Sequence, residues 1–160
     1  DWPHPMKKVF WQIIKLVLFA FLILTLQIAV LKEISDISFN LPLVAIITIA
    51  SFSSLEISLY SASIFIAAIS LLSYDNTIYW AYLIAAFITN QLNPKNLEDK
   101  FLVAAFYCSL FTPIFEIFFT PVKEHLINKC IINTLINLAT LIPVYFVLKL
   151  ALSNKKKAIY

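Results

Sequence analysis

Glu116 is the residue of this sequence with the strongest potential for chemistry, because it lies inside a long apolar stretch. A carboxylate at the centre of a bilayer costs about 2.5–3.5 kcal/mol, so it needs water or a polar partner. Pro113, one turn earlier, leaves a backbone carbonyl that also needs a donor. Two interpretations stay open. Glu116 is either a rim residue that touches water, or it faces a helix bundle and pairs with Asn133, Asn137 or Lys129.

Asn133 and Asn137 are four residues apart, which places both on one face of a helix. We expect them to form hydrogen bonds between helices, each worth less than about 2 kcal/mol. No two carboxylates have the spacing of a general acid and base, and His4 and His125 lie far apart outside the apolar stretches. The sequence therefore predicts no enzyme, no catalytic residue, no metal site and no cofactor.

The composition is that of an integral membrane protein. Hydrophobic residues make up 61% of the 160 residues and charged residues 13%, against about 45–50% and about 25% in soluble domains. The absence of glycine excludes phosphate loops, the dinucleotide fingerprint and GxxxG helix dimers, and all twelve basic residues are lysine. Cys108 and Cys130 fall in apolar segments, so we expect them to be small core residues.

The stretch 41–72 organises the rest of the chain. As one helix its 32 residues would be about 48 Å long, whereas a bilayer core is about 30 Å thick. Ser53 followed three residues later by Glu56 matches a capping box, which would start a new helix. The sequence thus predicts a hairpin of helices at about 41–52 and 54–72, with Glu56 at a water-facing turn. The alternative is one strongly tilted helix with a buried Glu56.

Four further apolar stretches bring the expected number of short membrane helices to six. The spans are placed at about 9–31, 41–52, 54–72, 77–92, 101–120 and 127–152. A signal peptide competes for the first span, but the apolar core from Leu16 to Leu31 exceeds the usual 7–15 residues. Met6 followed by two lysines resembles a native start. We therefore expect residues 1–5 to be a remnant of an expression vector, and 6–160 to form one membrane domain.

The lysines predict the orientation of these six spans. Nine lie at the termini or in the loops of one side: Lys7, Lys8, Lys15, Lys95, Lys100, Lys149, Lys155, Lys156 and Lys157. Three lie on the other side: Lys32, Lys123 and Lys129. Because lysine is enriched on the cytosolic side of membranes, both termini are expected in the cytosol.

Small residues recur at helical spacing in two places. One stripe consists of Ala50, Ser54, Ser58 and Ala62, and a second of Ala81 and Ala85, continued by Thr89. Small side chains let membrane helices approach closely. We expect these stripes to form helix contacts. A stripe that the bundle leaves free would contact lipid or a partner helix.

Four features recur in a familiar order over residues 9–150: Leu26-Gln27, Leu41-Pro42, the segment 60–76 and the closing segment 137–150. With the six short spans, they resemble the MreD family, the small membrane protein of the bacterial rod-shape (elongation) complex. The family usually has glycines and an Asp around 63–73, where this chain has serine and alanine. The resemblance implies a non-catalytic scaffold of the bacterial inner membrane. It also implies an MreC-like single-span partner, with links to the MreB filament, a RodA-type glycosyltransferase and its transpeptidase in peptidoglycan synthesis.

A second resemblance belongs to another functional class. Six short helices with a broken segment are similar to the substrate-binding subunits of energy-coupling-factor vitamin transporters. Such a subunit would need a polar pocket open to the outside, and would be stabilised by its vitamin.

Overall fold

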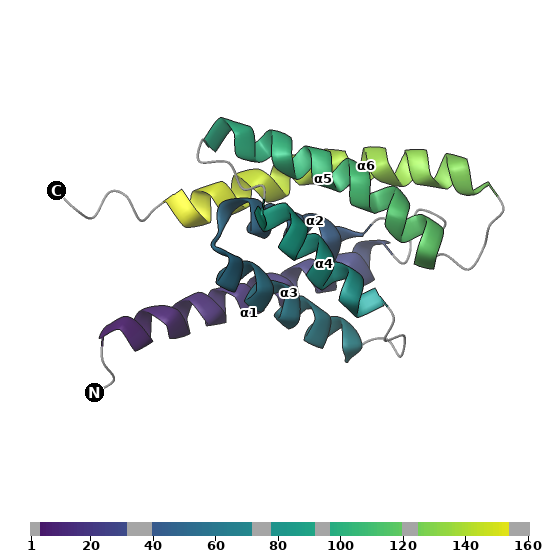
Figure 1. Cartoon of the computed structure of the whole chain (residues 1–160). Helices are drawn as coiled ribbons and strands as arrows, with labels where there is room; N and C mark the ends of the chain where they lie inside the picture. Colours follow the sequence, from purple (N-terminus) through teal and green to yellow (C-terminus); the bar gives the residue numbers. More distant parts are fainter. Residues whose placement is uncertain (1–3, 32–39, 72–77, 92–96, 120–124, 154–160) are drawn as a thin grey trace.

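The computed structural model describes residues 4–31, 40–71, 78–91, 97–119 and 125–153, and these residues are helical with no strand among them. They form six helices (Figure 1): α1 (His4–Leu31), α2 (Leu41–Phe52), α3 (Leu55–Ser70), α4 (Ile78–Gln91), α5 (Leu97–Phe119) and α6 (Leu126–Ser153). The prediction of an all-helical chain with six helices is confirmed over this part. Predicted span ends at 72, 77, 92 and 120 lie outside the described residues.

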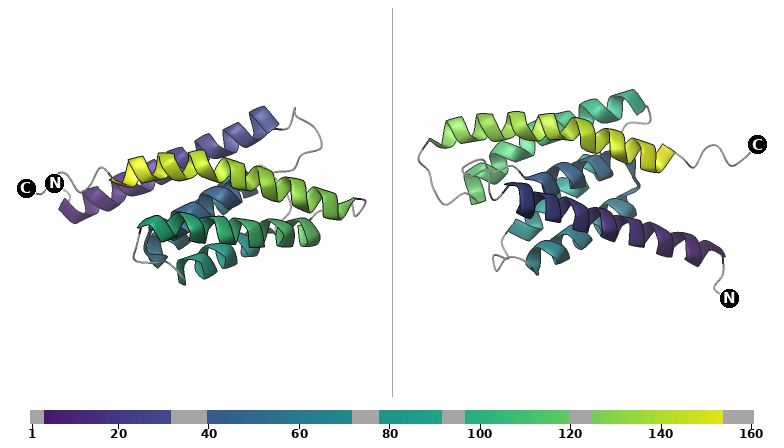
Figure 2. Two further views of the ribbon diagram at one scale, coloured as in Figure 1. Left: turned by 90° about the horizontal axis from the view of Figure 1, so that it is seen from above. Right: turned by 180° about the vertical axis from the view of Figure 1, so that it is seen from behind.

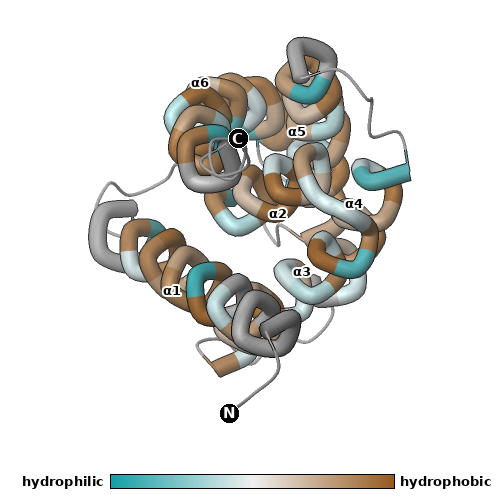
Figure 3. The backbone as a smooth tube through the Cα atoms, turned by 90° about the vertical axis from the view of Figure 1, so that its left-hand side faces the viewer, coloured by the Kyte–Doolittle hydropathy of each residue, from teal (hydrophilic) through white to brown (hydrophobic). Residues whose placement is uncertain are grey.

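Helix α2 is the core of the molecule. Every residue from Leu41 to Ser51 is buried, and α2 contacts each of the other five helices. Its sequence, LPLVAIITIASF, is apolar on all sides, which is the pattern of a helix surrounded by others. Viewed along the bundle, α2 lies in the middle of the other helices (Figure 3).

The five outer helices follow one another around α2 in the order α1, α3, α4, α5, α6. Each contacts the next, whereas α1 and α6 do not contact each other over the described residues. Helices that are consecutive in the chain run in opposite directions. As a result the first turn of α1 and the last turn of α6 lie at the same end of the bundle (Figure 2).

The structure confirms the hairpin between 41 and 72 and excludes the single tilted helix. It contradicts the predicted capping box. Ser53 is the C-cap of α2, where the backbone becomes extended, and its N–H and its hydroxyl both donate back to the carbonyl of Ile49, at 3.0 and 2.6 Å. The N-cap of α3 is Ser54, whose side chain makes no capping bond. Glu56 is exposed at the turn, as expected.

Two other helix boundaries differ from the prediction. Helix α1 begins at His4, before Met6, and α5 begins at Leu97 in the segment expected to be a loop. By length and composition, Lys100–Phe119 and Leu126–Leu150 are long and apolar enough to cross a membrane. The apolar stretches Ile14–Gln27, α2 and α3 are shorter.

Candidate functional site

The first turn of α2 lies in a cluster of polar side chains from several helices. Asn40 is its N-cap, and the Asn40 Oδ1 accepts from the backbone N–H of Leu43 at 3.1 Å. The same oxygen accepts from the hydroxyl of Tyr82 on α4 at 2.8 Å. The backbone N–H of Asn40 donates to Asn137 Oδ1 on α6 at 3.1 Å. Donors that a helix start leaves unpaired are thus bound by other helices.

Two more helices complete this cluster. The N–H of Leu41 donates to Gln27 Oε1 on α1 at 3.0 Å. Asn137 Nδ2 donates to Thr112 Oγ1 on α5 at 2.9 Å, and Thr112 donates in turn to the carbonyl of Cys108 at 2.7 Å. The N-terminal cluster, defined as Gln27, Asn40, Tyr82, Thr112 and Asn137, therefore joins α2 to α1, α4, α5 and α6.

Glu116 and Asn133 pair one turn away on the same two helices. Asn133 Nδ2 donates to Glu116 Oε1 at 2.8 Å. Glu116 is only 7% exposed, so its interpretation as a water-touching rim residue is wrong. Of the three expected partners, Asn133 bonds Glu116, while Asn137 bonds Thr112 and Asn40. The two pairs form a polar ladder that holds α5 against α6.

A second polar cluster closes the other end of α2. Asn90 Nδ2 on α4 lies 3.2 Å from the carbonyl oxygen of Ala50, 2.8 Å from that of Ser53 and 3.1 Å from Ser58 Oγ. Ser53 Oγ and Ser58 Oγ are 3.0 Å apart. These bonds satisfy carbonyls at the end of α2 and fix the α2–α3 turn against α4.

The two small-residue stripes lie inside the bundle. Ala50, Ser58, Ala62 and Ala85 are fully buried. Ala81 is half-buried, and Ser54 is exposed at the turn. They lie where α2, α3 and α4 contact one another. The buried members of both stripes therefore serve contacts within the chain. A contact of either stripe with a partner helix stays a prediction.

Most of the polar side chains of the interior serve to join helices. Gln27, Asn40, Tyr82 and Asn90 were not identified from the sequence as such residues, although an Asn before Leu41-Pro42 is a recognisable capping signal. Within the described ranges, no group of three or more His, Cys, Asp or Glu gathers to hold a metal. Cys108 is a buried free cysteine, as expected for a core residue, whereas Cys130 is free but only partly buried, so the expectation of a core residue is wrong there.

Two open grooves lie on the outside of the bundle. One, between α3 and α4, is lined by Leu59, Ser63, Trp80, Leu83, Ile84 and Phe87. The other, between α5 and α6, is lined by Ser109, Pro113, Cys130, Ile131, Thr134 and Leu135. No family model, curated protein or solved structure matches the chain, so function must be argued from this geometry.

Proposed function

We propose that this chain is a six-span scaffold of the bacterial inner membrane that performs no catalysis. In this proposal it binds an MreC-like single-span protein and helps to organise peptidoglycan synthesis. The observation that carries the proposal is the use of the interior polar groups. Asn40, Asn90, Asn133 and Asn137 bond to other helices of the same chain. What the molecule offers to others is its outer surface.

The outer surface supports a membrane location. Each outer helix exposes at least one large apolar side chain by 66% or more: Phe21, Tyr60, Trp80, Phe118 and Ile127. Large apolar side chains exposed on every outer helix favour a lipid environment. Lipid would cover these side chains, and the two long helices α5 and α6 meet the length requirement of a span.

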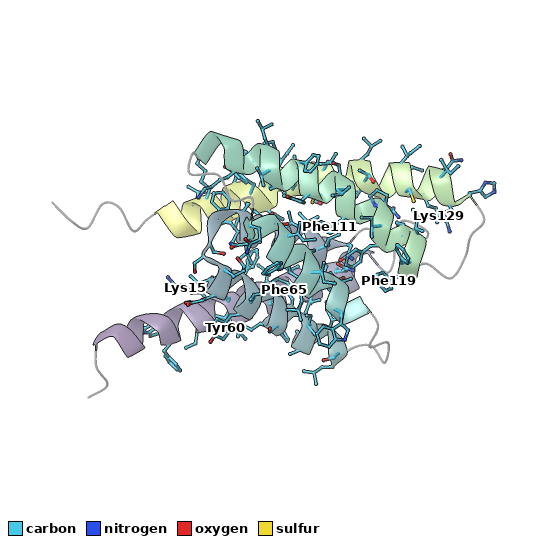
Figure 4. All side chains as sticks on the ribbon, viewed as in Figure 1. Lys15, Tyr60, Phe65, Phe111, Phe119 and Lys129 are labelled. Atoms are coloured by element: carbon cyan, nitrogen blue, oxygen red, sulfur yellow. The ribbon has the colours of Figure 1, made fainter. Side chains whose placement is uncertain are left out.

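The lysines of the described helices support the proposed orientation. Lys100 at the start of α5 and Lys149 near the end of α6 lie at the end of the bundle that holds the first turn of α1. Lys15 lies toward the same end and Lys129 toward the other (Figure 4). The positive-inside rule then places the helix ends His4 and Ser153 on the cytosolic side.

The vitamin-transporter alternative receives less support from the site. A binding subunit needs polar groups directed at a ligand, but the N-terminal cluster of α2 consists of groups bonded to one another. Helix α2 fills the centre of the bundle. The two grooves between outer helices are open and mostly apolar. A scaffold requires neither polar groups directed at a ligand nor a binding space at the centre of the bundle.

Co-expression with the MreC protein of the same organism tests the proposal. The tagged chain is purified from membranes in mild detergent, and the recovery of MreC is compared with that of an unrelated single-span protein. Selective recovery of MreC is the expected result. If MreC is not recovered, and a vitamin raises the unfolding temperature of the isolated chain, the transporter-subunit function replaces the scaffold.

A further inference from the structure

The groove between α5 and α6 contains a backbone acceptor without its helical donor. Pro113 has no N–H, so the carbonyl of Ser109, four residues earlier, loses the bond that continues a helix. Both residues line the groove, and Ser109 lies near the middle of α5. Within the part of the chain that the structure describes, no side chain donates to this carbonyl.

The two hydroxyls among the groove's lining residues each donate to a carbonyl of their own helix. Ser109 Oγ donates to the carbonyl of Phe106 at 2.7 Å, and Thr134 Oγ1 donates to that of Cys130 at 2.6 Å. Their protons are therefore directed into their own helices. The groove offers oxygen lone pairs between the apolar side chains of Ile131 and Leu135, which are 55% and 61% exposed.

We propose that this groove is the docking site for a membrane-spanning helix of a partner protein that carries a hydroxyl or amide donor near the middle of its span. The inference rests on the proposed membrane location, where water cannot supply the missing donor. A partner helix of this kind covers Ile131 and Leu135 with its apolar side chains. Its donor bonds the carbonyl of Ser109.

Neither lipid nor a symmetric second copy meets this requirement. Acyl chains fill an apolar groove but have no hydrogen-bond donor. A two-fold dimer through this groove is isologous, so the same surface patch would meet itself. The polar groups around Ser109 and Thr134 would then face the same groups, and the other donor among the lining residues, the thiol of Cys130, is weak. A separate helix with its own donor is the occupant that completes the site.

Pro113→Ala tests the role of the carbonyl, because alanine restores the N–H that pairs with it. Pro143→Ala is the matched control: Pro143 also lies within a helix and is exposed, but does not line the groove. Alanine favours the helix at both positions. Pro113→Ala should weaken partner association about threefold to tenfold, the range for one hydrogen bond between membrane helices. Pro143→Ala should leave it unchanged.

Photo-crosslinking in cells measures this association at the groove itself. A benzophenone amino acid replaces Leu135 in the α5–α6 groove or, as the control position, Phe87 in the α3–α4 groove. Adducts are identified by mass spectrometry in the unchanged background, in Pro113→Ala and in Pro143→Ala. We expect an adduct from position 135 to a membrane-spanning segment, which decreases with Pro113→Ala only.

The outcomes separate this inference from the proposed function. Lipid adducts alone at position 135, an adduct with a second copy, or a protein adduct that Pro113→Ala leaves unchanged would overturn the docking site. MreC crosslinked from position 87 and not from 135 would retain the scaffold function but reject the groove. A Pro113-dependent adduct with a different membrane protein would retain the groove and reject MreC.

Discussion

Replacing Asn40 by Ala removes one oxygen that joins the start of the central helix to α4. The Asn40 Oδ1 accepts from the N–H of Leu43 and from the hydroxyl of Tyr82. Loss of an N-cap costs about 1 kcal/mol. The Tyr82 hydroxyl, in a side chain only 5% exposed, would lose its acceptor, which costs about 1–3 kcal/mol. We expect Asn40→Ala to lower the free energy of unfolding by about 2–4 kcal/mol in total.

Tyr82→Phe tests whether part of the cost of Asn40→Ala comes from the bond between Asn40 and the Tyr82 hydroxyl. Alone it leaves the cap of α2 intact and should cost about 1 kcal/mol. In the Asn40→Ala background it removes the stranded hydroxyl, so the double variant should be more stable than the sum of the single effects predicts. Equilibrium unfolding by SDS in mixed micelles measures all three variants. Asn128→Ala, at an exposed position of α6, is the control and should change stability by less than about 0.5 kcal/mol.

Two results would refute this reasoning. One is Asn40→Ala with no larger effect than Asn128→Ala, which would mean that the cap and the bond to Tyr82 contribute nothing measurable. The other is strict additivity of Asn40→Ala and Tyr82→Phe, because residues that share a bond must couple.

Two further predictions follow from the interior contacts. Glu116→Gln should retain the fold and the proposed binding of an MreC-like partner, because Gln keeps an acceptor for Asn133. Glu116→Leu should cost about 1–3 kcal/mol of unfolding free energy; a folded Gln variant that alone loses partner binding would indicate a proton-linked role instead. Ala85→Leu should overpack the contact of α4 with α2 and cost about 1–3 kcal/mol in the same unfolding assay, whereas Ser54→Leu at the exposed turn should be tolerated. Equal effects of these two leucine variants would contradict the burial of Ala85.

The hairpin was predictable because the length of the apolar stretch can be compared with the thickness of a bilayer without knowing which helices pack against it. A stretch of 32 residues is too long for one ordinary span. The capping assignment at Ser53 was wrong because serine occurs at both helix ends. A hydroxyl that caps the next helix and one that bonds back to Ile49, four residues earlier, have the same local sequence.

The polar contacts were predictable only in part. The i, i+4 spacing of Asn133 and Asn137 indicated one helix face, and that face does meet Glu116. The bond from the N–H of Asn40 to Asn137 joins residues 97 positions apart. A single sequence does not reveal which helices become neighbours, so Tyr82 and Asn90 carried no recognisable signal.

The central claim, a six-span bundle around a buried α2, is tested most directly by cysteine labelling from each side of the membrane. Ser54→Cys, His125→Cys and Ile47→Cys are made separately in a background with Cys108→Ala and Cys130→Ser. Position 54 lies in the α2–α3 turn, 125 precedes α6 at the opposite end, and 47 is fully buried in α2. The account predicts labelling of 54 from the cytosolic side only, of 125 from the outer side only, and of 47 from neither. Labelling of 54 and 125 from the same side, or ready labelling of 47, would contradict it.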